Sequence, residues 1–285
     1  KALAPPLMGE VQNDDLLERI SAATASVAAM PPISVVVCTR DRTDSLAHCL
    51  LSLLGLRYPD FEIIVVDNAP SSDATRRLVA ALPVRYVREV RPGLDWARNR
   101  GISEARHSIV ALTDDDVQVD PQWLTGIAAG FESPDVMLVT GLICPRELET
   151  TPQIIFEYQY GGMGKGCQGW SWRCDSARPA LFVGTHHLGA GANMAFRKEV
   201  FGRSGYFDTA LDVGTPSHGG GDLDMFFRVI ACGGTARYEP RALVWHTPRT
   251  ELPALERQWS DNGRAFGVYL LARCVDSRRR LVPPS

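Results

Sequence analysis

The chain has 285 residues, 45% of them hydrophobic, which is enough to bury the core of one large α/β domain or two small ones. Its 30 Lys and Arg residues nearly balance its 33 Asp and Glu residues, for a formal net charge of -3. So small a charge argues against nucleic acid as the main partner.

The cysteines and the N-terminal segment indicate the compartment. Cysteines stand at positions 38, 49, 144, 167, 174, 232 and 274, an odd set with no C-x-x-C pair, unlike a secreted disulfide framework or a common zinc site. Asp14, Asp15 and Glu18 lie where a signal peptide needs its apolar stretch, and no apolar run is long enough to span a membrane. We therefore expect reduced thiols in a cytoplasmic protein. Because residue 1 is Lys, the natural chain can continue upstream.

From Ile33 the chain alternates between strand-like and helix-like patterns. Short β-branched apolar runs predict strands that are buried on both faces, at residues 33–38, 61–67, 84–89 and 108–113. Apolar residues at helical spacing predict helices between them, at residues 43–56, 73–82 and 93–105. This order predicts an α/β fold with a doubly wound, Rossmann-like, mostly parallel sheet and right-handed crossovers.

The alternation ends after residues 136–143, and the segment 144–191 is rich in Gly, Trp, Tyr and Pro without a clear period. We expect an irregular loop or lid there. Regular patterns then return and predict a strand at 192–197, a helix at 223–234, a strand at 235–246 and a last helix from about Leu252 to Arg273.

Polar clusters follow three of the predicted strands, at residues 39–42, 67–68 and 114–116. Ligands of open α/β sheets bind outside the carboxyl ends of the strands, so these clusters are candidate binding residues. Turn chemistry is the alternative for each. The three adjacent carboxylates of Asp114, Asp115 and Asp116 raise one another's pKa unless a cation neutralises them, which predicts Mg or Mn rather than a solvated acidic turn.

Arg98 lies in the stretch GLDWARNRG, near the start of a predicted helix on the same edge of the sheet. Its guanidinium could bind a phosphate or a base carbonyl with two hydrogen bonds. The alternative is an exposed helix arginine in a weak ion pair.

Together these stretches resemble the family 2 glycosyltransferases of the GT-A fold, and in particular a bacterial branch without an assigned acceptor. The resemblance runs from about Pro32 to about Tyr269, and its donor-side motifs occur in the family's order as ISVVVCTRDR, IIVVDNA, GLDWARNRG and LTDDDV. It implies a nucleotide-sugar site made of Thr39 and Asp67 at the base, Arg40 and Asp41 beside them, Arg98 near the base or phosphates, Asp114 near the ribose, and Asp116 on a metal. Asp115 belongs to the same donor site without an assigned contact.

The downstream stretches GAGANMAFR, GYFD, GGGDLDMFFR and VWH resemble the acceptor half of the same family. Gly221 stands where the family's G-E-D-x-D pattern has Glu, whereas Asp222 and Asp224 are kept. The resemblance implies Asp222 as the general base and His246 as a second metal ligand. For Asp222 the alternative is a helix N-cap, and for His246 a core histidine.

The resemblance therefore predicts a metal-dependent, inverting glycosyltransferase. It would use Mn2+ or Mg2+ to move a sugar from a nucleotide-diphosphate sugar, with UDP favoured, to a hydroxyl of a glycan, a lipid-linked or a small-molecule acceptor. The expected organisation is an N-terminal extension (1–31), a nucleotide-sugar-binding half (32–143), the loop or lid segment (144–191), and an acceptor-binding half with the C-terminal helix (192–285).

Two further segments carry predictions. The aromatic residues of the loop segment, Tyr158, Tyr160, Trp170 and Trp172, could stack on sugar rings or close over the donor, or merely pack against the body. The C-terminal helix combines an apolar face with Arg278, Arg279 and Arg280, which allows peripheral contact with the inner face of an anionic membrane; a solvated helix end is the alternative.

Three rival functions stay open. A retaining transferase would share much of the donor site. A nucleotidyltransferase should carry a glycine-rich phosphate loop after the first strand, and CTRDRTDS contains no glycine. A non-catalytic nucleotide-sugar-binding protein should have lost the base, but Asp222 is present.

Overall fold

The computed structural model of the protein describes residues 30–173 and 181–280. The folded unit begins at Pro31, so the predicted extension 1–31 falls almost entirely outside the described residues, as does Cys174. The other cysteines are free thiols, as expected for reduced cysteines (Cys38, Cys49, Cys144, Cys167, Cys232 and Cys274).

The N-terminal half forms the parallel part of one sheet, as its alternating pattern predicts. Its strands are β1 (Ile33–Thr39), β2 (Phe61–Asn68), β3 (Arg85–Glu89) and β4 (Ile109–Asp114). The chain runs outward from β1 through β2 to β3 and then crosses back to place β4 on the other side of β1, with all these strands parallel. The strand order thus reverses between β1 and β4, which is where a doubly wound sheet opens its ligand crevice.

The second half extends the same sheet and makes it mixed. Its strands are β5 (Val117–Val119), β6 (Val136–Pro145), β7 (Trp170–Arg173), β8 (Asn193–Arg197) and β9 (Thr235–His246). The main path is β3-β2-β1-β4-β8-β6-β9-β5, and β7 pairs with the beginning of β9. Strand β8 runs antiparallel to both β4 and β6, whereas β9 is parallel to β6.

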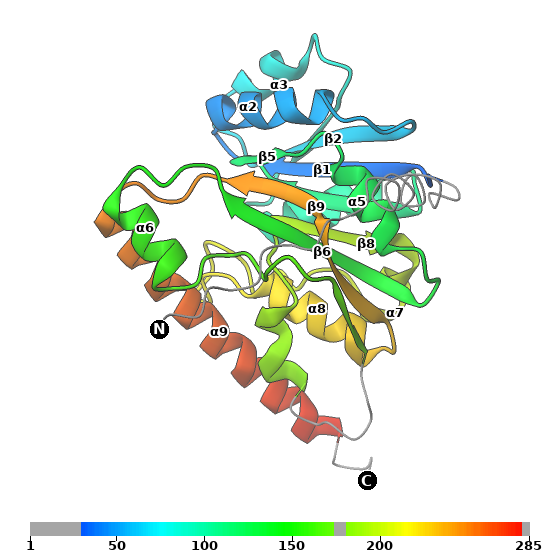
Figure 1. Ribbon diagram of the computed structural model, residues 1–285, viewed down its shortest axis with the longest axis vertical. Coiled ribbons are helices and arrows are strands. Elements are labelled where there is room, and N and C mark those ends of the chain that lie inside the picture. The colour runs from blue at the N-terminus through cyan, green and yellow to red at the C-terminus, as the bar shows by residue number, and fades with distance from the viewer. Residues whose placement is uncertain (1–29, 174–180, 281–285) are drawn as a thin grey trace, which may run out of the picture. The chain divides into compact units, whose positions relative to one another are not determined.

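Helices cover both faces of this sheet (Figure 1). Helices α4 (Leu94–Glu104), α7 (Phe201–Ser204) and α8 (Gly221–Ala231) bury their apolar residues in one cluster with one side of the sheet. On the other side lie α2 (Thr43–Leu54), α3 (Ala74–Val79) and α5 (Trp123–Gly130). In α2 the buried residues recur at helical spacing, as the sequence predicts (Leu46, Cys49, Leu50 and Leu53).

Strand β5 and helix α5 are elements that the sequence patterns do not predict. Strand β5 has three residues, too few to show a period. Helix α5 contains Gly126 and Gly130, which lower helix propensity. A Cβ on Gly126 would lie 2.4 Å from the backbone nitrogen of Ala242, beside a bulge in β9. Glycine at this position lowers the helix propensity of α5 but allows the helix backbone to lie close to β9.

The segment 144–191 is only partly irregular, in contrast to the expectation of an irregular loop. It contains the end of β6, helix α6 (Thr151–Tyr158), strand β7 and a 3₁₀ turn, η1 (Leu181–His187). Gln153 fixes the start of α6, because its Oε1 accepts hydrogen bonds from the backbone N–H groups of Glu149 and Thr150 at 2.9 and 3.0 Å. These elements are too short to produce a period among so many glycines.

The aromatic residues of this segment pack mainly against the protein body. Trp170 stacks on Tyr238 of β9, with ring centroids 5.6 Å apart, and Tyr160 stacks on Trp259 at 5.8 Å. Tyr158 differs, since 80% of its surface is exposed. The packing alternative therefore holds for Trp170, Trp172 and Tyr160, whereas Tyr158 is exposed and its contact with a ligand stays a prediction.

Helix α9 (Leu252–Arg280) runs seven residues beyond the predicted end and lies below the sheet in Figure 1, beside α6 and α8. The side chains of Arg278, Arg279 and Arg280 fall outside the described part of the helix. Within the described ranges, no helix is both long and apolar enough to cross a membrane.

Replacing Gly126 with Ala should destabilise the fold, although Ala normally favours a helix over Gly. The new methyl group would meet backbone atoms of Arg241 and Ala242 at 2.4–2.6 Å, and those atoms cannot rotate away. We expect a loss of about 1–3 kcal/mol in the free energy of unfolding, measured by urea denaturation. Gly263→Ala in α9 is the matched control, because its methyl would meet nothing within 4 Å. It should be neutral or gain up to about 1 kcal/mol, and equal losses in both variants would contradict this account.

Candidate active site

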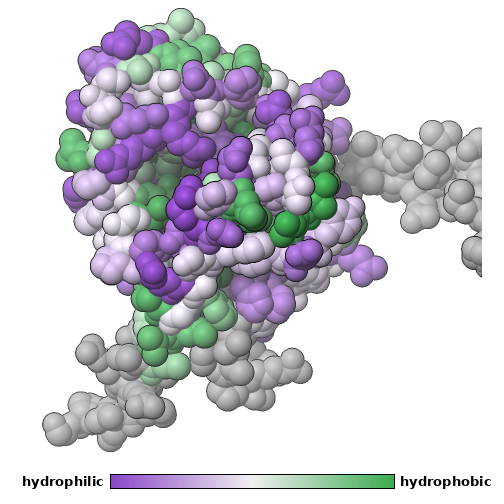
Figure 2. Space-filling model, turned by 90° about the vertical axis from the view of Figure 1, so that its left-hand side faces the viewer, coloured by the Kyte–Doolittle hydropathy of each residue, from purple (hydrophilic) through white to green (hydrophobic). Residues whose placement is uncertain are grey.

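The three polar clusters meet at one edge of the sheet, as their positions after parallel strands predict. Thr39 pairs with Asp67 of β2, and Cys38 pairs with Asp114 of β4, so the three strands end at nearly the same level. Figure 2 looks onto this edge, which lies on the left of Figure 1, and shows hydrophilic residues gathered around a hollow. The edge is thus the candidate active site.

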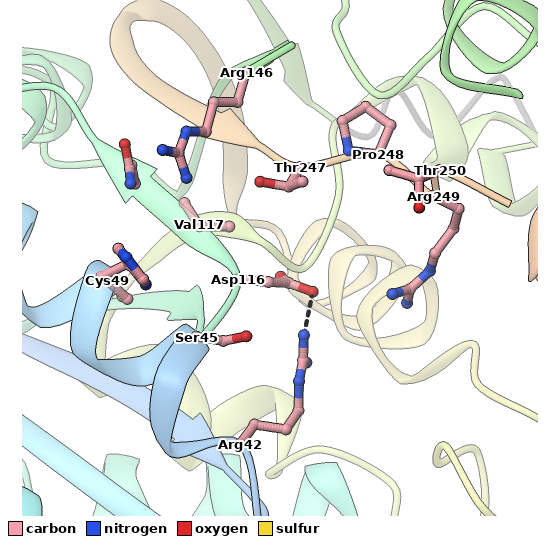
Figure 3. Close-up of a pocket in the computed structure, with 12 residues that line it drawn as sticks. Arg42, Ser45, Cys49, Asp116, Val117, Arg146, Thr247, Pro248, Arg249 and Thr250 are labelled. Atoms are coloured by element: carbon pink, nitrogen blue, oxygen red, sulfur yellow. Dashed lines mark hydrogen bonds and ion pairs between the residues drawn. The ribbon is translucent and has the colours of Figure 1, made fainter. Parts of the chain in front are cut away.

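The acidic turn between β4 and β5 presents its three carboxylates differently. Asp115 points inward and is 3% exposed; its Oδ2 accepts a hydrogen bond from Thr39 Oγ1 at 2.7 Å, and its Oδ1 pairs with Arg42 at 2.7 Å. Arg42 also bonds Asp116 Oδ2 at 2.8 Å (Figure 3). Asp115 therefore stabilises the turn, which leaves Asp114 and Asp116 as the carboxylates presented to a ligand.

The two presented carboxylates have opposite pKa shifts. Burial raises the pKa of Asp114 to about 6, and the negative charges of Asp116 and Asp115 add to this effect while Arg98 opposes it. Burial acts in the same direction on Asp116, but His246 and Arg42 outweigh it and lower the pKa of Asp116 below its ordinary value. Asp116 is thus ionised at neutral pH and suited to bind a cation.

His246 lies beside Asp116 because the last residue of β9 pairs with Val117 at the start of β5. Its Nε2 is 3.9 Å from Asp116 Oδ1, too far for a hydrogen bond, and its buried Nδ1 has no hydrogen-bond partner within residues 30–173 and 181–280. Burial lowers the pKa of His246 against the opposing effect of Asp116, so the ring is neutral. A neutral imidazole with an unsatisfied nitrogen is unlike the satisfied core histidine of the alternative interpretation.

These two side chains fit a hard divalent cation, although the described residues contain no group of three or more His, Cys, Asp or Glu side chains that could hold one. Mg2+ and Mn2+ commonly take one or two protein carboxylates and complete their shell with water and substrate phosphates, and imidazole suits Mn2+ as a ligand. Asp116 and His246 would be such ligands. Here the guanidinium of Arg42 supplies the positive charge opposite Asp115 and Asp116.

The residues predicted to meet the base lie at the ends of β1 and β2, beside the crevice between β1 and β4. Asp67 is fully buried; its Oδ2 accepts a hydrogen bond from the Tyr86 hydroxyl at 2.9 Å, and its Oδ1 has no hydrogen-bond partner in the part of the chain that the structure describes. Asp41 is exposed and accepts hydrogen bonds from the backbone N–H and the hydroxyl of Ser71, both at 2.9 Å. It therefore ties the loop after β1 to the loop after β2, while Arg40 is exposed to solvent.

Arg98 is buried rather than exposed, so the alternative of a solvated helix arginine is wrong. It is 7% exposed; Nη1 bonds Asp95 Oδ1 at 3.0 Å, and Nη2 lies 3.8 Å from Asp114 Oδ1. Its guanidinium also lies over the ring of Phe207, 5.4 Å from the centroid. Arg98 thus reaches from α4 to the acidic turn.

Asp95 is a site residue that the sequence analysis did not identify. It is 1% exposed, and burial raises its pKa to about 7, with Asp212 adding to the shift and Arg98 opposing it. The motif GLDWARNRG drew attention to Arg98, whereas nothing in the spacing showed that Asp95 would face inward. An aspartate in the first turn of a helix reads as an ordinary exposed capping residue.

Asp212 was also missed, and it fixes the start of α4. Its two carboxylate oxygens accept the backbone N–H groups of Leu94 and Asp95 at 2.9 and 2.8 Å. Asn68 holds the preceding residue, since its Oδ1 accepts the N–H of Gly93 at 2.9 Å. Gly93 must be glycine, because its φ is +141° and a Cβ there would lie 2.4 Å from Asp212 Oδ2. Asp212 lies 117 residues from Asp95 in a loop, so no local pattern could have shown it.

Asp222 occupies the second position of α8, after Gly220 as the N-cap, so it is not the N-cap itself. Its Oδ1 accepts the N–H of Leu223 at 2.9 Å, and its Oδ2 accepts the N–H of Gly191 at 3.0 Å. A Cβ on Gly191 would lie 2.6 Å from Arg98 Nη2 and 3.4 Å from Asp222 Oδ2. Arg98 and Asp222 therefore lie against the same backbone position.

Asp224, the other acidic residue kept from the motif, faces away from this site. It is fully buried and pairs with Arg228 at 2.7 Å and with Arg273 at 3.1 Å. These ion pairs join α8 to α9, so Asp224 has a structural role.

A pocket of about 290 Å³ adjoins Asp116 on the side of α2 and the segments that follow β6 and β9. Figure 3 shows Arg146 and Arg249 on different sides of this pocket, with Asp116 near its centre and Arg42 reaching Asp116 from below. Sequence reasoning did not identify Arg146 or Arg249, which lie in the loops just beyond β6 and β9. Their positive charge suits an anionic group next to Asp116.

This geometry agrees with comparisons to known proteins. The family model described as "Glycosyl transferase family 2" matches residues 34–205, which is more than half of the chain. The chain belongs to this family of glycosyltransferases, as its motifs predict.

Curated relatives are similar over a large part of the chain. The pre-mycofactocin glycosyltransferase of Mycobacterium tuberculosis is 27% identical over 238 residues, covering 82% of this chain and 46% of that protein. The glucosyl-dolichyl phosphate glucuronosyltransferase of Haloferax volcanii is 25% identical over 184 residues, covering 62% and 56%. The hyaluronan synthase of Pasteurella multocida is 25% identical over 240 residues, which cover 75% of this chain and 24% of that protein. The chain thus spans from a quarter to just over half the length of these relatives.

Solved structures show the fold. S. aureus TarS 1-349 in complex with UDP-GlcNAc matches with a TM-score of 0.55 at 15% identity, covering 77% of this chain and 59% of that one. The mannosyltransferase PcManGT from Pyrobaculum calidifontis, in complex with GDP-Man and Mn2+, also has a TM-score of 0.55, at 20% identity, covering 82% and 65%. This chain has the GT-A fold that the sequence predicts.

The free energy of unfolding should fall as the pH rises from about 5 to about 8, partly because of Asp95. The pKa of Asp95 is about 7 in the folded protein and 3.8 as an ordinary value. Between these two pH values the folded state binds one proton more than the unfolded state, so its stabilisation decreases as the pH rises and is lost above pH 7. Asp95→Asn should shrink the difference between urea denaturation at pH 5 and at pH 8 by about 1–3 kcal/mol. An unchanged difference would show that Asp95 is ionised throughout.

Proposed function

We propose that the protein is an inverting, metal-dependent glycosyltransferase that moves a sugar from a nucleotide-diphosphate sugar to an acceptor hydroxyl. One observation carries the proposal: Arg98 reaches toward Asp114 on the donor side and lies against Gly191, whose N–H binds Asp222. The carboxylates suited to hold the donor and the carboxylate suited to activate the acceptor thus lie around one guanidinium.

The crevice between β1 and β4 would bind the nucleotide. Oδ1 of Asp67, which has no hydrogen-bond partner among the described residues, is an acceptor for a base N–H, and Thr39 lies beside Asp67 at the end of the neighbouring strand β1. Asp114, with its side chain 34% exposed, is placed for the ribose hydroxyls. A uracil presents one ring N–H to such an acceptor, so UDP is the favoured nucleotide. That TarS is described with UDP-GlcNAc and PcManGT with GDP-Man supports the nucleotide-sugar class.

Asp116 and His246 would hold Mn2+ or Mg2+, and the likeness to a mannosyltransferase described with Mn2+ supports this assignment. A divalent cation supplies charge that stabilises the departing nucleotide diphosphate. Arg146 and Arg249 add positive charge around the pocket beside Asp116. Arg42 binds Asp116 through Oδ2, which would leave Oδ1, 3.9 Å from His246 Nε2, for the cation.

Asp222 would act as the general base. It takes the proton of the acceptor hydroxyl as the oxygen forms its bond to the anomeric carbon, and the bond to the diphosphate breaks with its electron pair leaving on the diphosphate. The Gly191 N–H, 3.0 Å from Oδ2, fixes the carboxylate in place. Because the hydroxyl attacks from the face opposite the leaving group, the configuration inverts. A product with retained configuration by NMR would exclude this mechanism.

The acceptor would be a hydroxyl group of a glycan, a small molecule or a lipid-linked compound. Tyr158, which is 80% exposed on α6, would offer its ring for stacking on a sugar of such an acceptor. Leu271 is 67% exposed on α9, ahead of the arginines that end that helix. For a lipid-linked acceptor this end of α9 would touch an anionic membrane surface from the cytoplasmic side.

Asp116→Ala should abolish Mn2+-dependent donor binding. The wild-type protein with Mn2+ is titrated calorimetrically with a panel of UDP- and GDP-sugars, and slow donor hydrolysis is followed in parallel. We expect one donor to bind and the variant to lose at least about tenfold in affinity, because one of two protein ligands is gone. Asp60→Ala, exposed at the opposite edge of the sheet, is the control. Wild-type binding by the Asp116 variant would remove Asp116 from the metal site.

Asp222→Asn should separate donor binding from transfer. Asn keeps the size of the side chain and a hydrogen-bond acceptor for Gly191 but cannot take the hydroxyl proton, so kcat should fall about 10²- to 10⁴-fold with donor affinity retained. Transfer to an acceptor panel is measured by product mass, with donor binding by calorimetry. Normal turnover in this variant would exclude Asp222 as the base.

A further inference from the structure

Gly221, the residue that departs from the family pattern, has no room for a side chain. It is the buried first residue of α8, and a Cβ built on it would lie 1.9 Å from Asp95 Oδ2 and 2.8 Å from Asp95 Cγ. The volume that a side chain at position 221 would fill is therefore occupied by a carboxylate that comes from α4. The Glu that the family pattern has at position 221 and the carboxylate of Asp95 would therefore occupy the same volume.

Asp95 is held in this place from both ends. Asp212 binds its backbone N–H at 2.8 Å, and Arg98 Nη1 binds its Oδ1 at 3.0 Å. Its Oδ2 is buried and has no hydrogen-bond partner among the described residues. A fold gains nothing from an unsatisfied buried carboxylate oxygen, because burying it without a partner costs free energy. An arrangement of this kind at the edge of a site indicates a functional role.

Asp95 also determines how Arg98 is oriented. The guanidinium has Asp95 on Nη1 and Asp114 on the side of Nη2, and the same Nη2 would lie 2.6 Å from a Cβ on Gly191. Gly191 in turn donates its N–H to Asp222. Removing the Asp95 carboxylate leaves Arg98 free to rotate toward Asp114, and so changes the contacts of the backbone that holds Asp222.

We propose that Asp95 is a positioning residue for the transfer reaction, and that its carboxylate occupies the volume that Gly221 leaves open, so that Arg98 and the Gly191–Asp222 pair keep their relative placement. This inference rests on the proposed function. Gly221 is glycine here because Asp95 supplies the carboxylate from the opposite helix. The two positions form one unit, and a side chain at 221 displaces Asp95.

The test is a double-mutant cycle between the two positions. Asp95→Ala should lower kcat about 10- to 100-fold and change the KM for donor less than it changes kcat, because the Gly191–Asp222 pair that loses its placement acts on the acceptor hydroxyl. Gly221→Ala alone should give a similar loss, since its methyl pushes the Asp95 carboxylate away from Arg98. In the Asp95→Ala background the same Gly221→Ala change should alter kcat less than about twofold, because the clash is gone.

Two further variants control for the effects of a new methyl group and of a lost carboxylate charge. Gly202→Ala, whose methyl would meet nothing within 4 Å, should leave kcat at the wild-type value. Asp95→Asn keeps an oxygen for Arg98 and should retain more activity than Asp95→Ala, and thermal melts and donor binding show that each variant is folded. Additive losses, or an Asp95→Ala variant with wild-type kcat, would overturn the positioning role.

The cycle distinguishes this inference from the proposed function. If wild type transfers sugar and Asp222→Asn does not, the proposed function stands, and additivity then overturns only the role of Asp95. If wild type transfers sugar to no acceptor while binding no nucleotide sugar, the proposed function fails and the role of Asp95 in transfer fails with it.

Discussion

The candidate site depends on how the charge of one buried residue is neutralised. Arg98 carries a guanidinium into the interior, and an unpaired charge there would cost several kcal/mol. Carboxylates from separate elements surround it: Asp95 from its own helix, Asp114 from β4, and Asp222 on α8 close enough to shift its pKa upward. Because these carboxylates neutralise Arg98, the ends of β4, α4 and α8 lie close together. These ends form the two sides of the site.

Sheet geometry then determines what each side presents. Parallel pairing in register brings the ends of β1, β2 and β4 to one level, which places Thr39 against Asp115. The pairing of β5 with β9 brings His246 beside Asp116, although 130 residues separate them in the chain. Gly126 lets α5 approach the backbone of β9, and Gly191 leaves room for the side chains of Arg98 and Asp222. The site is therefore a product of strand register more than of any single motif.

The sequence predicts well what local pattern determines. The period of the apolar residues predicts β1 to β4 and α2 to α4, and the strand-end rule predicts the region of the site. It does not predict which carboxylate of the triple aspartate turns inward, because Thr39 and Arg42 decide that through tertiary contacts. It misses Asp95 and Asp212 for the same reason, since each is defined by partners in other elements. The short strand β5 is stabilised by β9 and not by its own residues.

Arg42 bears on whether the acidic turn needs a metal ion in order to fold. Its guanidinium pairs with Asp115 and Asp116 at 2.7 and 2.8 Å, so the acidic turn carries its own counter-charge in the folded chain. Structural zinc sites differ, because there the binding free energy of the ion is the folding free energy of the domain. The ion pairs of Arg42 can hold the turn without an ion. Assembly of the fold would then not depend on the proposed cation, and chelation would leave an intact, refillable apoprotein.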